Sequence, residues 1–160
     1  MNILVSEVER AYIAGFFDGE GSVSFCYRRT NKGYPQWAFC ITITNTRRDV
    51  LEWIRLLYSG VIVQVRNAPK SNQKPCFSLR IYRGAETILS DIYPFVRLKK
   101  RQVEIGLEIR ALILAKNRKN ERGHPIAESN ILRRKELLAE LKLLNRRGFS
   151  TENHKEPIPA

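Results

Sequence analysis

The sequence predicts one α+β domain in which a four-stranded antiparallel sheet packs against helices. Hydrophobic residues follow a helical period, then a period of two, then a helical period again, and this cycle occurs twice. Each period-two segment has a turn-forming stretch near its middle, as a β-hairpin requires. The length of 160 residues suits one domain with its own core. We place this domain at residues 1–150 and expect a mobile tail over 151–160.

The first helix is expected to begin after Ser6 and to run to about Phe17. Ser6 is a suitable N-cap, and Glu9 three positions later would complete a capping box. The helix then runs into two carboxylates, Asp18 and Glu20, set among glycines. Acids at the negative end of a helix macrodipole are penalised by a few tenths to about 1 kcal/mol each. A positive group is therefore expected there, and a divalent metal is the natural candidate.

Two hairpins follow, each with one apolar and one polar face. Residues 22–28 and 36–44 alternate in character around a turn at 31–35, and residues 61–66 and 76–82 do so around a loop at 67–75. Between the hairpins, residues 45–49 are expected to cap a helix that stops before Gly60.

Three further helices are expected after the second hairpin. One contains Ile88, Leu89 and Ile92 and stops at Pro94, and a longer one has its apolar positions between residues 98 and 112. Residues 117–129 are polar and are interpreted as a linker to a last amphipathic helix over 137–144.

The composition favours a polyanionic partner. The formal charge is +12 and the isoelectric point is about 10.0, which indicates nucleic acid first and an anionic membrane second. No apolar run approaches the ~18–20 residues of a membrane span, and no signal-peptide pattern is visible at the N-terminus. The three cysteines are widely spaced, which argues against a disulfide framework or a zinc site and for a reducing compartment.

Residues 13–21, Ile-Ala-Gly-Phe-Phe-Asp-Gly-Glu-Gly, resemble the signature of the LAGLIDADG homing endonucleases. The resemblance covers about residues 9–113 and implies an αββαββα fold whose sheet forms a DNA-binding saddle, with C-terminal helices extending to about 147. It also implies an intron-encoded enzyme that cleaves double-stranded DNA at a long, near-palindromic site. Mg²⁺-dependent phosphodiester hydrolysis would leave short 3′ overhangs. No small-molecule substrate is expected. The family's usual location is a chloroplast or mitochondrion, or a prokaryotic cytoplasm, and we do not expect secretion.

The resemblance also assigns roles to individual residues. Glu20 stands in the place of the family's metal-binding acid, and the Gly19 carbonyl is the usual main-chain metal ligand. Asn45 ends the second strand, where relatives have a Gln or Asn that organises solvent around the attacking water. Lys99 follows a Pro-Phe-x-x-Leu pattern and would face the scissile phosphate.

One position departs from the family pattern. Some relatives have a basic residue four positions after the Gln or Asn, and this chain has Asp49 there. Arg47 and Arg48 are the alternatives that could supply the missing charge.

A homodimer is expected, because the sequence contains one such motif and single-motif relatives act as pairs. Small residues four apart, such as Ala11 and Gly15, would let two helices approach closely. We read Asp18 as structural. The expected interface residues are Ala11, Ala14, Gly15 and Asp18.

The polar face of the sheet is the candidate DNA-binding surface. Gln, Arg, Ser and Thr are side chains that read base edges, and no acid is among the positions chosen. A strand of this length, about 30 Å at ~3.3 Å per residue, would span about nine base pairs. The chosen residues are Ser22, Ser24, Arg28, Gln36, Thr42, Gln64, Arg66, Ser78 and Arg80.

A solvent-exposed sheet face that merely lacks acids is the plain alternative. Cys26, Ala38 and Cys40 fall on the same face and either contact thymine methyl groups or have no such role.

Three other functions compete with the endonuclease. An RNA-binding intron maturase or a non-catalytic DNA-binding protein could use the same fold, but both are expected to lose the metal-binding acid, and Glu20 and Lys99 are both present. A ribosomal-type RNA binder would explain the charge but not two acids at the end of a helix.

Overall fold

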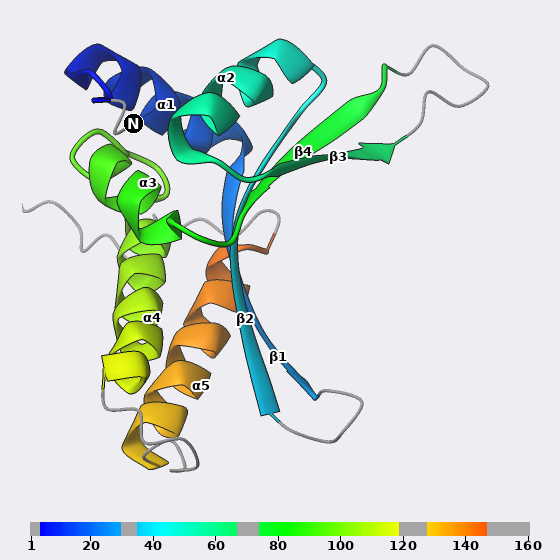
Figure 1. Ribbon diagram of the computed structural model, residues 1–160. Coiled ribbons are helices and arrows are strands. Elements are labelled where there is room, and N and C mark those ends of the chain that lie inside the picture. Colours follow the sequence, from blue (N-terminus) through cyan, green and yellow to red (C-terminus); the bar gives the residue numbers. More distant parts are fainter. Residues whose placement is uncertain (1–3, 30–34, 67–73, 119–127, 147–160) are drawn as a thin grey trace, which may run out of the picture.

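A curved four-stranded sheet runs through the molecule, with helices packed against one of its faces in this computed structural model (Figure 1). The structure describes residues 4–29, 35–66, 74–118 and 128–146. Its elements in order are α1 (Glu7–Glu20), β1 (Gly21–Arg29), β2 (Pro35–Asn45), α2 (Arg48–Tyr58), β3 (Val61–Arg66), β4 (Cys76–Ile81), α3 (Ala85–Ile92), α4 (Lys100–Arg118) and α5 (Glu128–Leu144). The predicted α+β class is confirmed, and the expected tail lies outside the described residues.

The start of α1 follows the sequence prediction and its end does not. The Glu9 amide donates to the Ser6 hydroxyl at 3.3 Å, and the Ser6 amide donates to the Glu9 carboxylate at 2.8 Å, so the capping box is confirmed. The helix continues beyond Phe17 to Glu20, and the Lys99 ammonium, from a distant part of the chain, donates to the Phe17 and Gly19 carbonyls of this last turn.

The strands pair antiparallel in the order β1-β2-β4-β3. On the apolar face, Val23 lies opposite Ile41, which in turn lies opposite Ile81, and all three are fully buried. Helices cover this face, with Ile13, Ile54 and Ile88 contributing fully buried side chains. The described helices include none that is both long and apolar enough to cross a membrane.

The register of β3 corrects one prediction. Ile62 lies opposite the buried Leu79, and Gln64 lies opposite Phe77, so the position of Gln64 belongs to the apolar face. The polar face instead carries Val61 and Val63 at this edge. Both sets of β3 residues contain apolar side chains, and a one-residue shift in register exchanges the two faces, so the pattern alone misassigned them.

The end of α5 is attached to the edge of the sheet. The Asn145 side-chain amide donates to the Val23 carbonyl at 2.9 Å, and α5 packs against both α4 and β1. Because β1 has a paired neighbour on one side only, this bond satisfies an edge carbonyl and fixes the C-terminal helices against the sheet.

Replacing Gly21 by alanine is expected to destabilise the fold. A Cβ at Gly21 would overlap Cδ2 of the fully buried Phe17 ring, so the ring would have to move. Overpacking of this kind costs about 1–3 kcal/mol in the free energy of unfolding, which denaturant titration measures. Gly19→Ala is the matched control, because a Cβ there meets nothing within 4 Å. An equal loss in both variants would rule out the packing explanation.

Candidate active site and nucleic-acid face

The C-terminal turn of α1 contains two acids and no basic residue. Asp18 is partly buried, and Glu20 is exposed. The sequence alone predicts that a positive group compensates them, and the structure supplies one from the loop that precedes α4. That group is the ammonium of Lys99, which lies among the carbonyl oxygens at the end of the helix.

Asp18 binds the backbone of this loop through both of its carboxylate oxygens. The Arg97 amide donates to Oδ2 at 2.7 Å, and the Lys99 amide donates to Oδ1 at 2.9 Å. The carboxylate is therefore engaged within its own chain, as the structural interpretation of Asp18 predicts. Whether Asp18 also lies in a dimer interface stays a prediction.

The Lys99 side chain reaches three carbonyls of α1 and its cap. Its Nζ donates to the oxygens of Phe17 at 3.2 Å, Gly19 at 3.4 Å and Gly21 at 2.6 Å. Burial lowers the pKa of Lys99, while the charges of Asp18 and Glu20 act to raise it. A partly buried cation therefore lies beside Glu20 and the Gly19 carbonyl, the two groups assigned to the metal.

These groups fit a hard divalent cation, although one chain supplies only part of a site. Carboxylate and carbonyl oxygens are the ligands that Mg²⁺ and Ca²⁺ prefer, and the carbonyl of Gly19 already interacts with a cation. Within the described ranges no cluster of three or more His, Cys, Asp or Glu side chains could hold a metal.

Asn45 ends β2, as predicted, near the end of α1. Ile43, two residues earlier, lies opposite Gly21, which directly follows the helix. The side-chain oxygen of Asn45 accepts the Arg47 amide at 2.8 Å and forms the turn into α2. Its side-chain NH₂ group is the remaining donor for solvent.

Arg47 and Arg48, the two candidates for the basic charge that Asp49 replaces, are both paired with acids. Arg47 donates from Nε to Asp49 at 3.0 Å, and Arg48 donates from Nε to Glu52 at 3.2 Å. The hydrogen bonds from Arg47 lower the pKa of the Asp49 carboxyl to about 2. Arg47 thus neutralises Asp49, whereas Arg48 shares the Glu52 carboxylate with Arg55.

The polar face of the sheet is as predicted on three strands. Ser22 lies opposite Thr42, which lies opposite Arg80, and the pairing of Arg28 with Gln36 puts these two positions on the same face. Arg66 lies opposite Cys76 beyond an irregularity in β3. The side chains of Arg28, Gln36 and Arg66 lie outside the part that the structure describes. No register position that shares this face in β1–β4 is acidic.

Ser78 has almost no exposed surface, at 1%, because it packs beside Thr44 and accepts a hydrogen bond from the Thr44 hydroxyl at 3.1 Å. The prediction that Ser78 contacts a duplex directly is therefore wrong for this conformation. Its neighbour Thr44 is partly exposed.

A shallow hollow of about 320 Å³ lies on the polar face. Tyr82, just after β4, is half exposed at its edge and was not among the predicted contacts. The sequence pattern could have identified Tyr82, since it continues the alternation of Ser78 and Arg80 on the polar face. The lining residues are Ser24, Cys26, Ala38, Cys40, Thr42, Arg80 and Tyr82.

The outer side of α1 is exposed and apolar. Ala11 and Gly15 are exposed there, beside Val8 and Tyr12, and a Cβ at Gly15 would meet nothing within 4 Å. We call these four residues the α1 surface. Ala14 is fully buried in its own chain, so its assignment to a dimer interface is wrong.

A groove continues from the α1 surface toward α2. The ring of Tyr12 packs edge-on against Trp53 at 5.6 Å between centroids. The groove is lined by Val8, Glu9, Tyr12, Asp49, Val50 and Trp53.

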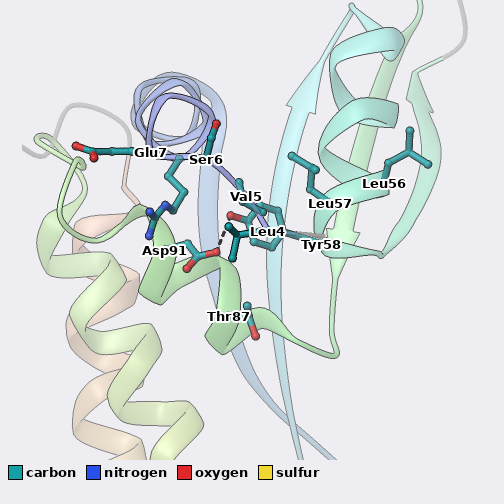
Figure 2. Close-up of a pocket in the computed structure, with 10 residues that line it drawn as sticks. Leu4, Val5, Ser6, Glu7, Leu56, Leu57, Tyr58, Thr87 and Asp91 are labelled. Carbon is teal, nitrogen blue, oxygen red and sulfur yellow. Dashed lines mark hydrogen bonds between the residues drawn. The ribbon is translucent and has the colours of Figure 1, made fainter. Parts of the chain in front are cut away.

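A separate cavity lies between the N-terminal segment, α2 and α3 (Figure 2). The Tyr58 hydroxyl donates to the Asp91 carboxylate at 2.8 Å and ties α2 to α3. Burial, followed by the Asp91 hydrogen bond, raises the pKa of Tyr58. Neither Glu20 nor Lys99 lines this cavity, so it is not the candidate active site.

Comparisons with known proteins agree with the fold. A family model described as a LAGLIDADG-like domain matches residues 7–88. The archaeal intron-encoded homing endonuclease I-Vdi141I, solved with DNA, is similar at a TM-score of 0.68 and 21% identity over 91% of this chain and 89% of that chain. I-CvuI, solved with its target in the presence of calcium, is similar at a TM-score of 0.64 and 20% identity, and the match covers 92% of this chain and 90% of that chain. No curated protein matches the chain.

A longer relative is matched over only part of its length. The meganuclease I-CpaMI, solved with uncleaved DNA, is similar at a TM-score of 0.61 and 17% identity. The match covers 90% of this chain but 46% of that chain.

Proposed function

The chain belongs to the LAGLIDADG-like family, and from this premise we propose that it is a homing endonuclease that cleaves double-stranded DNA at a specific long site. The observation that carries the proposal is the meeting of Glu20, Gly19 and Lys99 at the end of α1. A carboxylate, a carbonyl and a cation from a distant loop converge there, beside the end of an acid-free sheet face. Phosphodiester hydrolysis needs these charges in one place.

The proposed chemistry divides among a few groups. A divalent ion, when bound, supplies an activated water and neutralises charge that develops on the phosphate. The Glu20 carboxylate and the Gly19 carbonyl would hold that ion. The Lys99 ammonium would stabilise negative charge on the scissile phosphate, and the Asn45 NH₂ group would orient solvent. Two structures of the relative I-CvuI with DNA were solved in the presence of Ca or Mg, which supports a divalent ion, and we propose Mg²⁺ for this chain.

We propose that two copies form the active enzyme. One chain matches less than half of the longer I-CpaMI chain, which suits a second copy in place of that protein's other part. Pairing of the two α1 surfaces would bring both Glu20 residues to one end of the interface. A near-palindromic target would then lie across the sheets of both copies. Cleavage at two phosphates across the minor groove would leave short 3′ overhangs.

The cysteines allow a direct test of the proposed DNA face. Cys26, Cys40 and Cys76 are partly buried, free thiols at register positions of the polar face. Target DNA at ten times its Kd should slow their alkylation by N-ethylmaleimide about ten-fold, because about a tenth of the protein stays free. Mass spectrometry would give the rates, with a scrambled duplex as control. Unchanged alkylation with bound target would place the DNA on another surface.

The activity itself is tested by incubating the chain with a complex DNA library and mapping new ends. We expect unique staggered breaks in Mg²⁺ and none in Ca²⁺. Tight selective binding without breaks would contradict the endonuclease and favour a non-catalytic DNA-binding protein. Weak binding to every duplex, with tight binding to structured RNA, would favour a maturase.

A further inference from the structure

The loop that carries Lys99 is held on α1 by two side chains, the Asp18 carboxylate of the helix and the Lys99 ammonium of the loop. Hydrogen bonds from the Phe95 and Val96 amides to the Ile92 carbonyl hold its start, and the bond from the Val103 amide to the Lys99 carbonyl begins α4. Between these fixed points, the only side-chain acceptor that the described residues provide for the loop amides is the Asp18 carboxylate.

The two interactions of Lys99 form one unit with α1. Asp18 fixes the Lys99 backbone at 2.9 Å, and the Lys99 side chain then folds back onto the carbonyls that flank Asp18 in the same helix. A long lysine side chain has several rotatable bonds, so its ammonium finds this position only if its backbone is held. The negative charge of the Asp18 carboxylate also attracts the Lys99 ammonium.

We infer that Asp18 is a positioning residue that acts through Lys99, by holding the loop amides of Arg97 and Lys99 on the end of α1. This inference rests on the proposed function, since it assigns Asp18 a part in placing the charge that faces the phosphate. Asp18 is distinct from Glu20, because both of its oxygens already accept backbone hydrogens.

Amide hydrogen exchange, measured by NMR on the DNA-free wild-type chain, tests the docking without any activity. We expect the Arg97 and Lys99 amides to be protected, and Asp18→Asn to remove the protection of at least one, because an amide side chain can accept only through its single oxygen. Free exchange of both amides in the wild type would overturn the inference. This exchange measurement tests the docking even if the chain cleaves no DNA. Absence of cleavage would contradict only the proposed function.

A double-mutant cycle tests whether Asp18 acts through Lys99. Asp18→Asn should lower the single-turnover cleavage rate by about 10–100-fold, as displacement of a catalytic group by about 1 Å does, with the DNA Kd within about two-fold. In a Lys99→Met background the same change should lower the rate by less than about two-fold. Full additivity of the two losses would overturn the inference.

Asp91→Asn is the matched control for a purely structural effect. Asp91 also joins two elements through a hydrogen bond, but its partner is Tyr58, and it lines the cavity of Figure 2 instead of the C-terminal end of α1. We expect this variant to lower the unfolding midpoint and to leave the cleavage rate unchanged. An equal fall in cleavage rate for Asp91→Asn would show that lost stability explains the Asp18 effect, and would overturn the inference.

Discussion

Glu20→Gln is expected to abolish cleavage while the protein still binds its site. The substitution keeps the size of the side chain and removes the charge that would hold a divalent ion. Loss of metal-derived stabilisation worth several kcal/mol corresponds to a cleavage rate lower by about three powers of ten or more. Because Glu20 is exposed at the end of α1, the fold should tolerate the change. Single-turnover cleavage in Mg²⁺ and binding in Ca²⁺ measure the two effects.

Glu7→Gln provides the control, since Glu7 is an exposed acid at the opposite end of the same helix. It removes the same charge from the chain and should leave the cleavage rate unchanged. Wild-type cleavage by Glu20→Gln would mean that the metal assignment is wrong. Loss of binding together with cleavage would mean that Glu20 supports the DNA-binding conformation instead.

The order of elements was predictable because each one carries a local signal. The capping box at Ser6 and the alternation on β1, β2 and β4 depend on neighbours in sequence, and all of them are confirmed. The end of α1 was not predictable, because the Lys99 ammonium that binds the carbonyls of its last turn comes from a distant part of the chain. The face assignment of β3 failed for a related reason, since its partner β4 sets the register.

The candidate site was predictable in part. The resemblance identified Glu20 and Lys99, and the structure brings the ammonium of Lys99 to the turn that carries Glu20. Sequence reasoning named a metal as the compensating charge and did not foresee that the Lys99 ammonium also binds the carbonyls of this turn. A carboxylate that binds two backbone amides leaves no sequence pattern, so the contacts of Asp18 could be found only in the structure.

Gly15→Arg is expected to separate the dimer and leave the single chain folded. A side chain at Gly15 meets nothing within 4 Å in one chain, but two guanidinium groups would face each other if the α1 surfaces pair. Like charges brought together cost several kcal/mol, which weakens association by a factor of about 100 or more. Analytical ultracentrifugation should show monomers, and cleavage of the full site should fall with the loss of dimer.

Ser129→Arg adds the same charge at an exposed position of α5 and should change neither assembly nor cleavage. The decisive arm mixes Gly15→Arg with Gly15→Glu chains. Each alone repels its own copy, whereas the mixture can form an oppositely charged pair, so cleavage should return only on mixing. Recovery would place Gly15 against Gly15 across the two-fold axis. Because that axis would then run beside the ends of both α1 helices, the two Glu20 carboxylates would have to act as neighbours. A mixture that stays monomeric and inactive would move the interface to another surface of the chain.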